Sequence, residues 1–332
     1  MLNKTLTAST ERILAKYDVT KIRFKQNCLI DTNEFTLTQL NCLFELTKFY
    51  QANIHETQNL YPVNQLKYVA TLFYEASTRT KTSFNIALTN LGLKPINIDI
   101  STSSHTKGES LYDTLLTLKA MNVNLAIIRH SSSGVLNFIL ENYPDLNMKL
   151  INAGDGSHAH PTQALLDLFT LMEHEKNLKN KKIVIVGDIL HSRVARSNIH
   201  LLNLIGADVH LVGPETLVPF SSAEIKATIH HDLNTALTNA DFVMALRIQF
   251  ERQNQGFIIS VDDYVLKYQV NKHNLKLAKA NVKILHPGPV NRNIELADDL
   301  INDQSISLIQ KQVANGIQVR MACIAMLLKQ DH

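Results

Sequence analysis

Tryptophan is absent from this 332-residue sequence, and cysteine occurs only three times, at Cys28, Cys42 and Cys323. The cysteines lie far apart and form no CxxC pair, a pattern typical of a reduced cytoplasmic protein and not of a disulfide-bonded secreted one. Residues 1–16 lack the apolar core of a secretory signal, and no apolar run reaches the ~20 residues of a membrane-spanning helix. The sequence therefore predicts a soluble cytoplasmic chain with no membrane partner.

An excess of charge of one sign is also lacking. The chain has 33 Lys+Arg against 30 Asp+Glu, spread along its length, and only 6% aromatic residues. This composition argues against a nucleic-acid partner, because such proteins concentrate basic charge or present aromatic side chains to bases. At ~150 residues per domain the length predicts about two domains. The 45% of hydrophobic residues suffices for a core in each.

Short apolar runs alternate with longer stretches of helical periodicity. Such alternation predicts an α/β protein with parallel sheets, and runs that are apolar on consecutive residues indicate strands covered on both faces. We expect functional loops at the carboxyl ends of these strands. The runs are residues 125–129, 182–188, 209–213, 242–248 and 283–287.

A polar, glycine-containing stretch at residues 151–159 predicts a domain boundary, because strand–helix alternation restarts after the helix that follows it. The last segment, residues 305–328, predicts a long helix with one apolar face. That face comprises Ile306, Ile309, Val313, Ile317, Met321, Ile324 and Leu328.

The most informative segment is LFYEASTRTKT, residues 72–82, in which an apolar run is followed at once by hydroxyl and basic side chains. A strand, an anion-binding loop and a helix are predicted, since free N–H groups and the dipole at a helix N-terminus attract anions and Arg79 adds formal charge. A simple Ser/Thr helix cap with solvated basic residues explains the same residues equally well. No GxxxxGK[ST] phosphate loop is present in the chain.

A polar segment and a charged residue at a strand end also precede the predicted boundary. Residues 101–110, STSSHTKGES, contain Lys107 and predict either a basic flap or an ordinary exposed loop before a helix that starts near Leu111. Arg129 ends an apolar strand, a position at which charged residues in parallel sheets are more often functional than structural.

Residues 152–163, NAGDGSHAHPTQ, place two histidines and Gln163 in a turn that leads into a helix at about Pro161. His158 and His160 could be metal ligands, but no third and fourth ligand follows at a recognisable spacing. Hydrogen bonding to a small polar substrate explains His160 and Gln163 better. We expect no metal and no cofactor.

In the second half, the strand IVIVGD resembles the start of a dinucleotide fold, but GxGxxG is missing because only Gly187 is present. Arg193 and Arg196 follow on the next helix, where arginine could bind a carboxylate bidentately or lie on a solvated face, the latter better suited to Arg196. Arg247 ends another strand. Residues 285–293, LHPGPVNRN, predict a stiff turn that either presents backbone carbonyls to an amide or is an ordinary loop.

Read together, seven segments resemble the aspartate carbamoyltransferase catalytic chains, within the aspartate/ornithine carbamoyltransferase family, from about Leu72 to the C-terminus. Ornithine enzymes typically have an SMG-containing loop and an HCLP-like turn where this chain has RIQFER and HPGPVNR, so the resemblance favours a dicarboxylic acceptor. The segments, in the family's order, are FYEASTRTKTSF, KGES, IIRH, AGDGSHAHPTQ, GDILHSRVARSN, LRIQFER and HPGPVNR.

The resemblance implies a fold of two domains, each a parallel sheet flanked by helices. These are a carbamoyl phosphate domain (1–151), an aspartate domain (152–304) and a C-terminal helix (305–332) that packs back on the first domain. It implies transfer of a carbamoyl group from carbamoyl phosphate to L-aspartate, in pyrimidine synthesis. It also implies a homotrimer with shared active sites. Regulatory or other pathway chains as partners are left open.

The implied phosphate site comprises Ser77, Thr78, Arg79, Thr80 and Arg129, with Ser103 and Lys107 from a neighbouring subunit. Thr80, Arg129 and His160 would stabilise the carbamoyl oxyanion, with His160 as a hydrogen-bond donor in preference to a general base. The carbamoyl NH2 group would be bound by Gln163 and by the turn formed by Pro287, Gly288 and Pro289. Aspartate would be bound by Lys107, Arg193, Arg247 and Gln249.

Three alternatives stay open at this point. A carbamoyltransferase could use another acceptor, such as ornithine or a succinylated amine. An NAD-dependent dehydrogenase would explain the IVIVGD strand, and a non-catalytic homologue could serve as an interaction partner.

Overall fold

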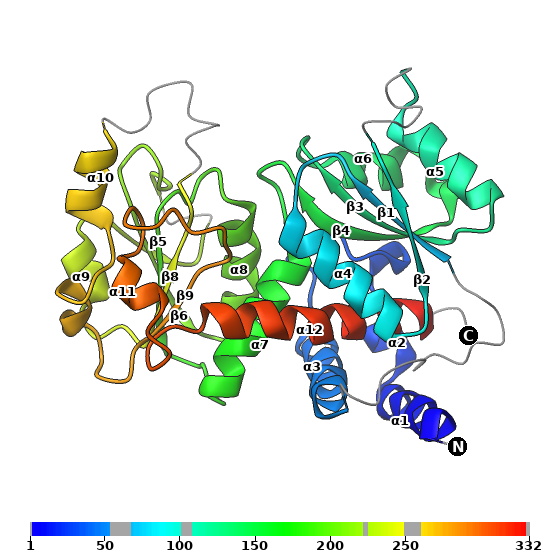
Figure 1. Ribbon diagram of the computed structural model, residues 1–332, viewed down its shortest axis with the longest axis horizontal. Helices are drawn as coiled ribbons and strands as arrows, with labels where there is room; N and C mark the ends of the chain where they lie inside the picture. The colour runs from blue at the N-terminus through cyan, green and yellow to red at the C-terminus, as the bar shows by residue number, and fades with distance from the viewer. Residues whose placement is uncertain (1, 54–67, 101–107, 222–224, 249–259, 330–332) are drawn as a thin grey trace. The chain divides into compact units, whose positions relative to one another are not determined.

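The computed structural model describes residues 2–53, 68–100, 108–221, 225–248 and 260–329. The chain forms two compact units: unit 1 comprises residues 1–162 and 314–332, and unit 2 comprises residues 163–313. Each unit contains a parallel β-sheet with helices packed on it (Figure 1), which confirms the predicted fold class.

Unit 1 is built on a four-stranded sheet of order β2-β1-β3-β4, in which every neighbouring pair is parallel. The chain passes from β1 to β2 on one side and then crosses to β3 on the other, so the direction in which strands are added reverses between β1 and β3. Ligands bind at such switch points in open α/β sheets. The strands are β1 (Tyr68–Phe73), β2 (Lys94–Ile98), β3 (Leu125–His130) and β4 (Lys149–Asp155).

Helices cover this sheet because alternate strand residues project to opposite faces. On one face, Ala70, Leu72, Ala126 and Ile128 pack in one hydrophobic cluster with residues of α5 and α6. The helices of unit 1 are α1 (Leu2–Ala15), α2 (Val19–Ile22), α3 (Leu37–Ala52), α4 (Thr78–Asn90), α5 (Leu111–Ala120) and α6 (Val135–Asn142), with 3₁₀ turns η1 (Lys25–Asn27) and η3 (Pro144–Leu146).

Unit 2 is built on a five-stranded parallel sheet of order β7-β6-β5-β8-β9. Its switch point lies between β5 and β8, because the chain runs from β5 to β6 and β7 on one side before it crosses to β8 and β9. The strands are β5 (Lys182–Val186), β6 (Asp208–Val212), β7 (Thr228–His230), β8 (Phe242–Ala245) and β9 (Lys283–Leu285).

The core of unit 2 joins strand residues such as Val184, Val243 and Ile284 to Leu233 of α9 and Tyr264 of α10, all of them buried. The helices are α8 (Arg193–Leu204), α9 (Leu233–Leu237), α10 (Val261–Tyr268) and α11 (Asp298–Ile301), with the 3₁₀ turn η5 (Asn274–Leu277). Two long helices, α7 (Pro161–His174) and α12 (Ile309–Lys329), contain the points at which the chain divides into its units.

The five predicted strands all form, as β3, β5, β6, β8 and β9. The polar stretch 151–159, in which we predicted a domain boundary, begins inside β4, whose seven residues are all buried. Buried Asn152 explains how a polar residue fits there, because its Nδ2 donates to the Ile30 carbonyl (2.9 Å) and to Asp155 Oδ1 (2.7 Å). The division falls at 162/163 and 313/314, against the predicted 151/152 and 304/305.

The C-terminal helix α12 belongs to unit 1 from Ala314 onward. There Lys149 Nζ donates to the Leu327 carbonyl (2.7 Å), and Arg320 Nη1 donates to Ser83 Oγ (2.8 Å). The helix begins at Ile309 and not at residue 305, so Ile306 lies outside it. Of the other residues on the predicted apolar face, Ile309, Met321, Ile324 and Leu328 are buried, whereas Val313 is 47% exposed in the single chain.

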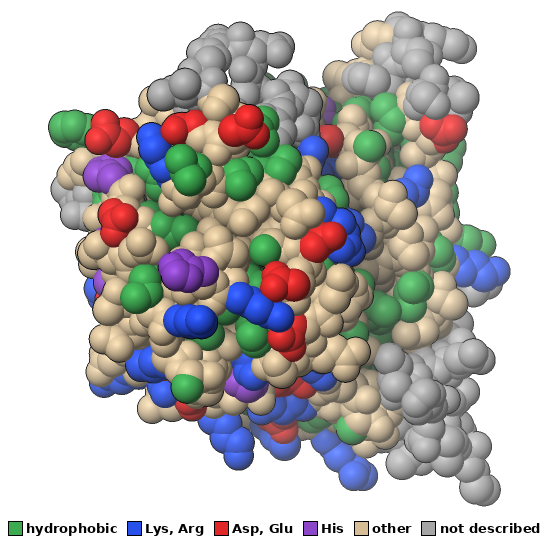
Figure 2. All heavy atoms as spheres, turned by 60° about the vertical axis from the view of Figure 1, so that its left-hand side comes forward, with side chains coloured by type: hydrophobic (Ala, Val, Ile, Leu, Met, Phe, Trp, Pro, Cys, Tyr) green, Lys and Arg blue, Asp and Glu red, His purple; other side chains and the backbone are tan. Residues whose placement is uncertain are grey.

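The surface carries charges of both signs. On the face shown in Figure 2, Lys and Arg side chains are interspersed with Asp and Glu side chains. No helix in the described ranges has the length and apolar character needed to cross a membrane.

Candidate active site

The N-terminus of α4 lies directly after β1, at the switch point of unit 1. Ser77 is the N-cap residue, yet its side chain makes no capping hydrogen bond to its own helix. By contrast, Ser110, Ser192 and Ser260 cap α5, α8 and α10 with their side chains. A simple serine cap therefore does not account for Ser77, and its hydroxyl remains suited to a ligand.

The next residues of α4 divide between solvent and core. Thr78 and Arg79 are exposed on the first turn, whereas Thr80 is only 6% exposed. Free N–H groups and the positive end of the helix dipole add to the charge of Arg79. The segment from Ser77 to Thr80 thus forms a positive edge at which a phosphate can bind.

Strand pairing brings Arg129 to this edge from the neighbouring strand. Arg129 is in register with Phe73, and its carbonyl accepts a hydrogen bond from the Tyr74 N–H (2.9 Å). Its side chain, 12% exposed, contacts Glu75 Oε2 through Nε (3.4 Å) and donates from Nη1 to the Ala153 carbonyl (3.4 Å). Residues 77–80 therefore follow β1, and Arg129 lies near the end of β3, and these are the two strands that flank the switch point.

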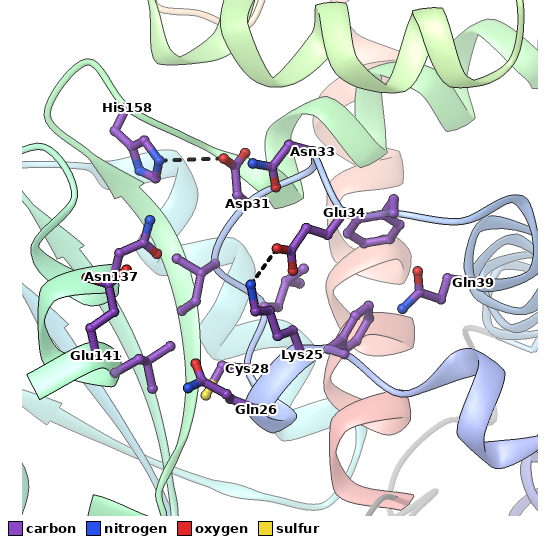
Figure 3. A pocket seen from close by; sticks show the side chains of 15 residues that line it. Lys25, Gln26, Cys28, Asp31, Asn33, Glu34, Gln39, Asn137, Glu141 and His158 are labelled. Atoms are coloured by element: carbon purple, nitrogen blue, oxygen red, sulfur yellow. Dashed lines mark hydrogen bonds and ion pairs between the residues drawn. The ribbon is translucent and has the colours of Figure 1, made fainter. Parts of the chain in front are cut away.

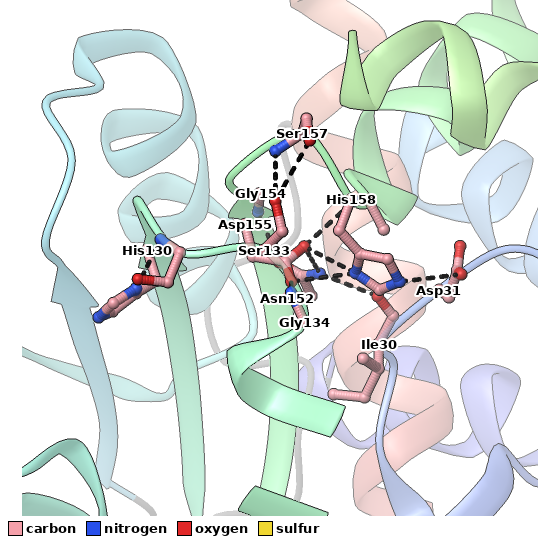
Figure 4. Close-up of polar contacts among 12 residues, drawn as sticks. Ile30, Asp31, His130, Ser133, Gly134, Asn152, Gly154, Asp155, Ser157 and His158 are labelled. Carbon is pink, nitrogen blue, oxygen red and sulfur yellow. Dashed lines mark hydrogen bonds and ion pairs between the residues drawn. The ribbon is translucent and has the colours of Figure 1, made fainter. Parts of the chain in front are cut away.

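The loop after β4 is organised by Asp155, whose carboxylate is fully buried (Figure 4). Oδ2 accepts the Gly134 N–H (2.7 Å), and Oδ1 accepts the Ala159 N–H (3.1 Å). His158 Nδ1 lies 3.0 Å from Oδ2, and its Nε2 lies 3.5 Å from Asp31 Oδ2. These contacts fix the loop that delivers His160, which is 4% exposed, to the start of α7.

His158 lies between two carboxylates that favour its protonated form. Hydrogen bonds to Asp155 and Asp31 raise its pKa to about 10 against the desolvation that opposes this shift. A protonated imidazole has no lone pair for a metal. No group of three potential metal-ligating side chains occurs in the parts of the chain that the structure describes.

We expect His158→Gln to destabilise the fold by ~2 kcal/mol near pH 6 and by much less near pH 10. Because the folded pKa lies above the unfolded one, the contribution is complete below pH ~6.5 and is lost as pH rises through about 10. Urea midpoints at both pH values, relative to wild type, measure the effect. His200→Gln, at an exposed position on α8, is the matched control. Equal destabilisation at both pH values would contradict a charged His158.

In unit 2, Arg193 and Arg247 follow the two strands that flank the switch point. Val186 of β5 pairs with Ala245 of β8, so both following loops leave the same edge of the sheet. Arg193 is the first residue of α8 and is 8% exposed, whereas Arg196 is exposed, as the sequence favoured. Arg247 is half-buried, and its Nε donates to Asn291 Oδ1 (3.4 Å).

The presence of glycine at position 187 is explained by the local structure, without a bound dinucleotide. Its φ is +126°, and a Cβ there would lie 3.0 Å from the Leu246 carbonyl oxygen. Glycine is therefore required by the close approach of the β5 and β8 loops.

The predicted turn after β9 is held from inside by His286 and Glu295, which are both buried. Gly288 N–H donates to His286 Nδ1 (2.8 Å), and His286 Nε2 lies 3.1 Å from Glu295 Oε1. The Glu295 carboxylate also accepts the Asn291 N–H (2.8 Å). Pro287, Gly288 and cis-Pro289 thus form an ordered turn connected to the loop that carries Arg247.

Gln163 lies on the first turn of α7 and is 8% exposed; its Nε2 donates to Asp167 Oδ1 (2.8 Å). Asp155, Asp167 and Glu295 were not predicted from the sequence to have a role. The i,i+4 spacing of Gln163 and Asp167 was an available signal. Three predicted residues, Ser103, Lys107 and Gln249, lie outside the described residues.

A separate pocket of about 220 Å³ opens in unit 1 on the Asp31 side of His158 (Figure 3). Lys25 and Glu34 form an ion pair of 2.7 Å at its wall. None of the residues predicted to bind substrate lines this pocket.

Known proteins share this combination of sheets and loops. A model of the aspartate/ornithine carbamoyltransferase carbamoyl-P binding domain matches residues 27–173, and a model of the Asp/Orn binding domain matches residues 179–327. The match begins at residue 27, well before the predicted start near Leu72.

Curated relatives extend the similarity over most of the chain. The aspartate carbamoyltransferase catalytic subunit of Endomicrobium trichonymphae is 49% identical over 261 residues, 79% of this chain and 82% of that protein. The catalytic subunit of Gloeobacter violaceus is 42% identical over 308 residues, 90% of this chain and 94% of that protein.

Solved structures of carbamoyltransferases have a similar fold. Aspartate transcarbamoylase from Trypanosoma cruzi, in complex with carbamoyl phosphate and aspartate, has a TM-score of 0.80 at 26% identity and covers 93% of this chain and 98% of that one. Ornithine carbamoyltransferase from Pyrococcus furiosus has a TM-score of 0.78 at 25% identity over 90% and 96% of the chains.

The chain belongs to the aspartate/ornithine carbamoyltransferase family. Within that family, the two curated relatives named above are aspartate carbamoyltransferase catalytic subunits.

Proposed function

We propose that the chain catalyses the transfer of the carbamoyl group of carbamoyl phosphate to the α-amino group of L-aspartate, giving N-carbamoyl-L-aspartate and phosphate. The observation that carries this proposal is the kind of side chain that lies at the switch point of each sheet. In unit 1, hydroxyl side chains and arginines lie at the carboxyl ends of the two strands that flank the switch point, and in unit 2 two arginines follow the corresponding pair of strands. The first set suits a phosphate, and the second suits a dicarboxylate.

The proposed roles follow from what each side chain can do. Ser77, Thr78 and Arg79 bind phosphate at the N-terminus of α4. Thr80, Arg129 and His160 donate to the carbamoyl oxygen and stabilise the negative charge that develops as the amine attacks. Aspartate binds through Arg193 and Arg247, with Gln249 in support.

Neither a covalent intermediate nor a metal is needed. Holding two reactants in an attacking geometry and neutralising developing charge can supply most of the acceleration. The uncharged α-amino group attacks, the bond from carbon to the phosphate oxygen breaks, and the departing phosphate is a suitable acceptor for the amine proton.

The wider setting of the reaction is also a proposal. We propose that this transfer is a step of pyrimidine synthesis and that it takes place in the cytoplasm. We place Ser103 and Lys107 in the active site of a neighbouring subunit, so that a homotrimer is the working unit.

We expect phosphate release to depend on L-aspartate and to be at least ~100-fold slower with L-ornithine or a succinylated amine at equal concentration. A site built for two carboxylates leaves buried charges unpaired with the wrong acceptor. A colourimetric phosphate assay with the three acceptors measures this, with spontaneous decay of carbamoyl phosphate as the blank. Faster release with ornithine would overturn the choice of acceptor, and release without any acceptor would overturn the transfer itself.

A further inference from the structure

Asp167 is a buried carboxylate that the reaction itself does not use. It lies on α7 one turn after Gln163, and its side chain is fully buried. Oδ1 accepts hydrogen bonds from Gln163 Nε2 (2.8 Å) and Gln312 Nε2 (2.7 Å). Oδ2 accepts a hydrogen bond from Asn198 Nδ2 (2.9 Å). Three amide groups therefore converge on one anion.

The carboxylate decides which way the Gln163 amide faces. An ionised carboxylate can only accept hydrogen bonds, so the NH2 group of each amide must point at Asp167. An amide carries its oxygen on the opposite side from its NH2 group. Gln163 therefore turns its Oε1 away from Asp167, and that atom is a hydrogen-bond acceptor.

The same anion orders the turn after β9. Gln312 donates to Asp167 at one end of its amide, and at the other end its Oε1 accepts the His286 N–H (2.9 Å). His286 in turn accepts the Gly288 N–H. Within the described ranges, no hydrogen bond reaches the carbonyls of Pro287 or Gly288, so both can accept from a ligand.

We propose that Asp167 is a positioning residue that makes the carbamoyl site select an NH2 group. It orients Gln163 so that Oε1 accepts a hydrogen bond from the carbamoyl nitrogen, and through Gln312 it holds the turn whose carbonyls accept from the same nitrogen. This proposal rests on the proposed function. It predicts that Asp167 controls discrimination between carbamoyl phosphate and acetyl phosphate, in which a methyl group replaces the NH2 group.

The test compares the KM for carbamoyl phosphate with the inhibition constant of acetyl phosphate in wild type and in Asp167→Leu. Leucine is of similar size and has no acceptor, so nothing holds the Gln163 amide. We expect the preference for carbamoyl phosphate to fall roughly tenfold, the effect of about one lost hydrogen bond. A merely structural role would weaken both ligands by the same factor and leave their ratio unchanged.

Asp241→Leu is the matched control, because Asp241 is also a buried carboxylate of unit 2 but pairs with Lys279 and the Lys182 N–H. It should lower stability and leave the ratio at the wild-type value. If Asp167→Leu does not fold, Asp167→Asn replaces it, with an expected fall of about twofold because one orientation of its amide still presents oxygen to Gln163.

The outcomes separate the two proposals. A wild-type protein that does not transfer the carbamoyl group refutes the proposed function. An active wild type whose ratio is unchanged in the folded Asp167 variant refutes the positioning role alone. A shift of the ratio in Asp241→Leu as large as in Asp167→Leu refutes it too, because instability would then be the cause.

Discussion

Replacement of Arg79 by alanine is expected to lower carbamoyl transfer by roughly a hundredfold to a thousandfold while the protein remains folded. Arg79 is exposed on the first turn of α4, so its side chain contributes little to the core. Its charge adds to the dipole at the site where phosphate would bind and depart. The loss should therefore appear in turnover and not in the unfolding midpoint.

The measurement is phosphate release at saturating L-aspartate, together with thermal unfolding of each variant. Arg196→Ala is the matched control, because Arg196 is an exposed arginine on the first turn of α8 that we assign no role. Near-normal turnover of a folded Arg79→Ala protein would contradict an anion-binding site at the N-terminus of α4.

The candidate site residues could be proposed from the sequence because their signals are local. A charged residue that ends an apolar run can be recognised without knowledge of the fold, as Arg129 and Arg247 show. The rule that functional loops lie at the carboxyl ends of parallel strands then places such residues on one edge of a sheet. The apolar runs of β5 and β8 were recognisable for the same reason, since both strands are buried on both faces.

What could not be predicted depends on contacts between distant parts of the chain. The polar residues of β4 did not look like a buried strand in the sequence. Asn152 can be buried there because its side chain donates a hydrogen bond to the carbonyl of Ile30, 122 residues away. The charge on His158 depends partly on Asp31. The role of Asp167 depends on Gln312, 145 residues away, and no local pattern reveals that pairing.

The second large effect concerns assembly, through complementation between two inactive variants. Lys107→Ala and Arg247→Ala should each be nearly inactive, since one removes the residue that we assign to a neighbour's site and the other removes an aspartate ligand. Unfolded together in equal amounts and refolded, they should regain activity. A site is intact when its Lys107 comes from an Arg247→Ala chain and its Arg247 comes from a Lys107→Ala chain.

Random mixing gives that combination a probability of ~1/2 × ~1/2, so about a quarter of the sites should be wild-type in composition. Separately refolded samples of each variant are the controls and should stay inactive. Native mass measurement of chains that differ by a small tag confirms that mixed trimers form. If mixed trimers form and their activity does not exceed that of the controls, Lys107 acts within its own subunit, because a site confined to one chain cannot be repaired by a neighbour.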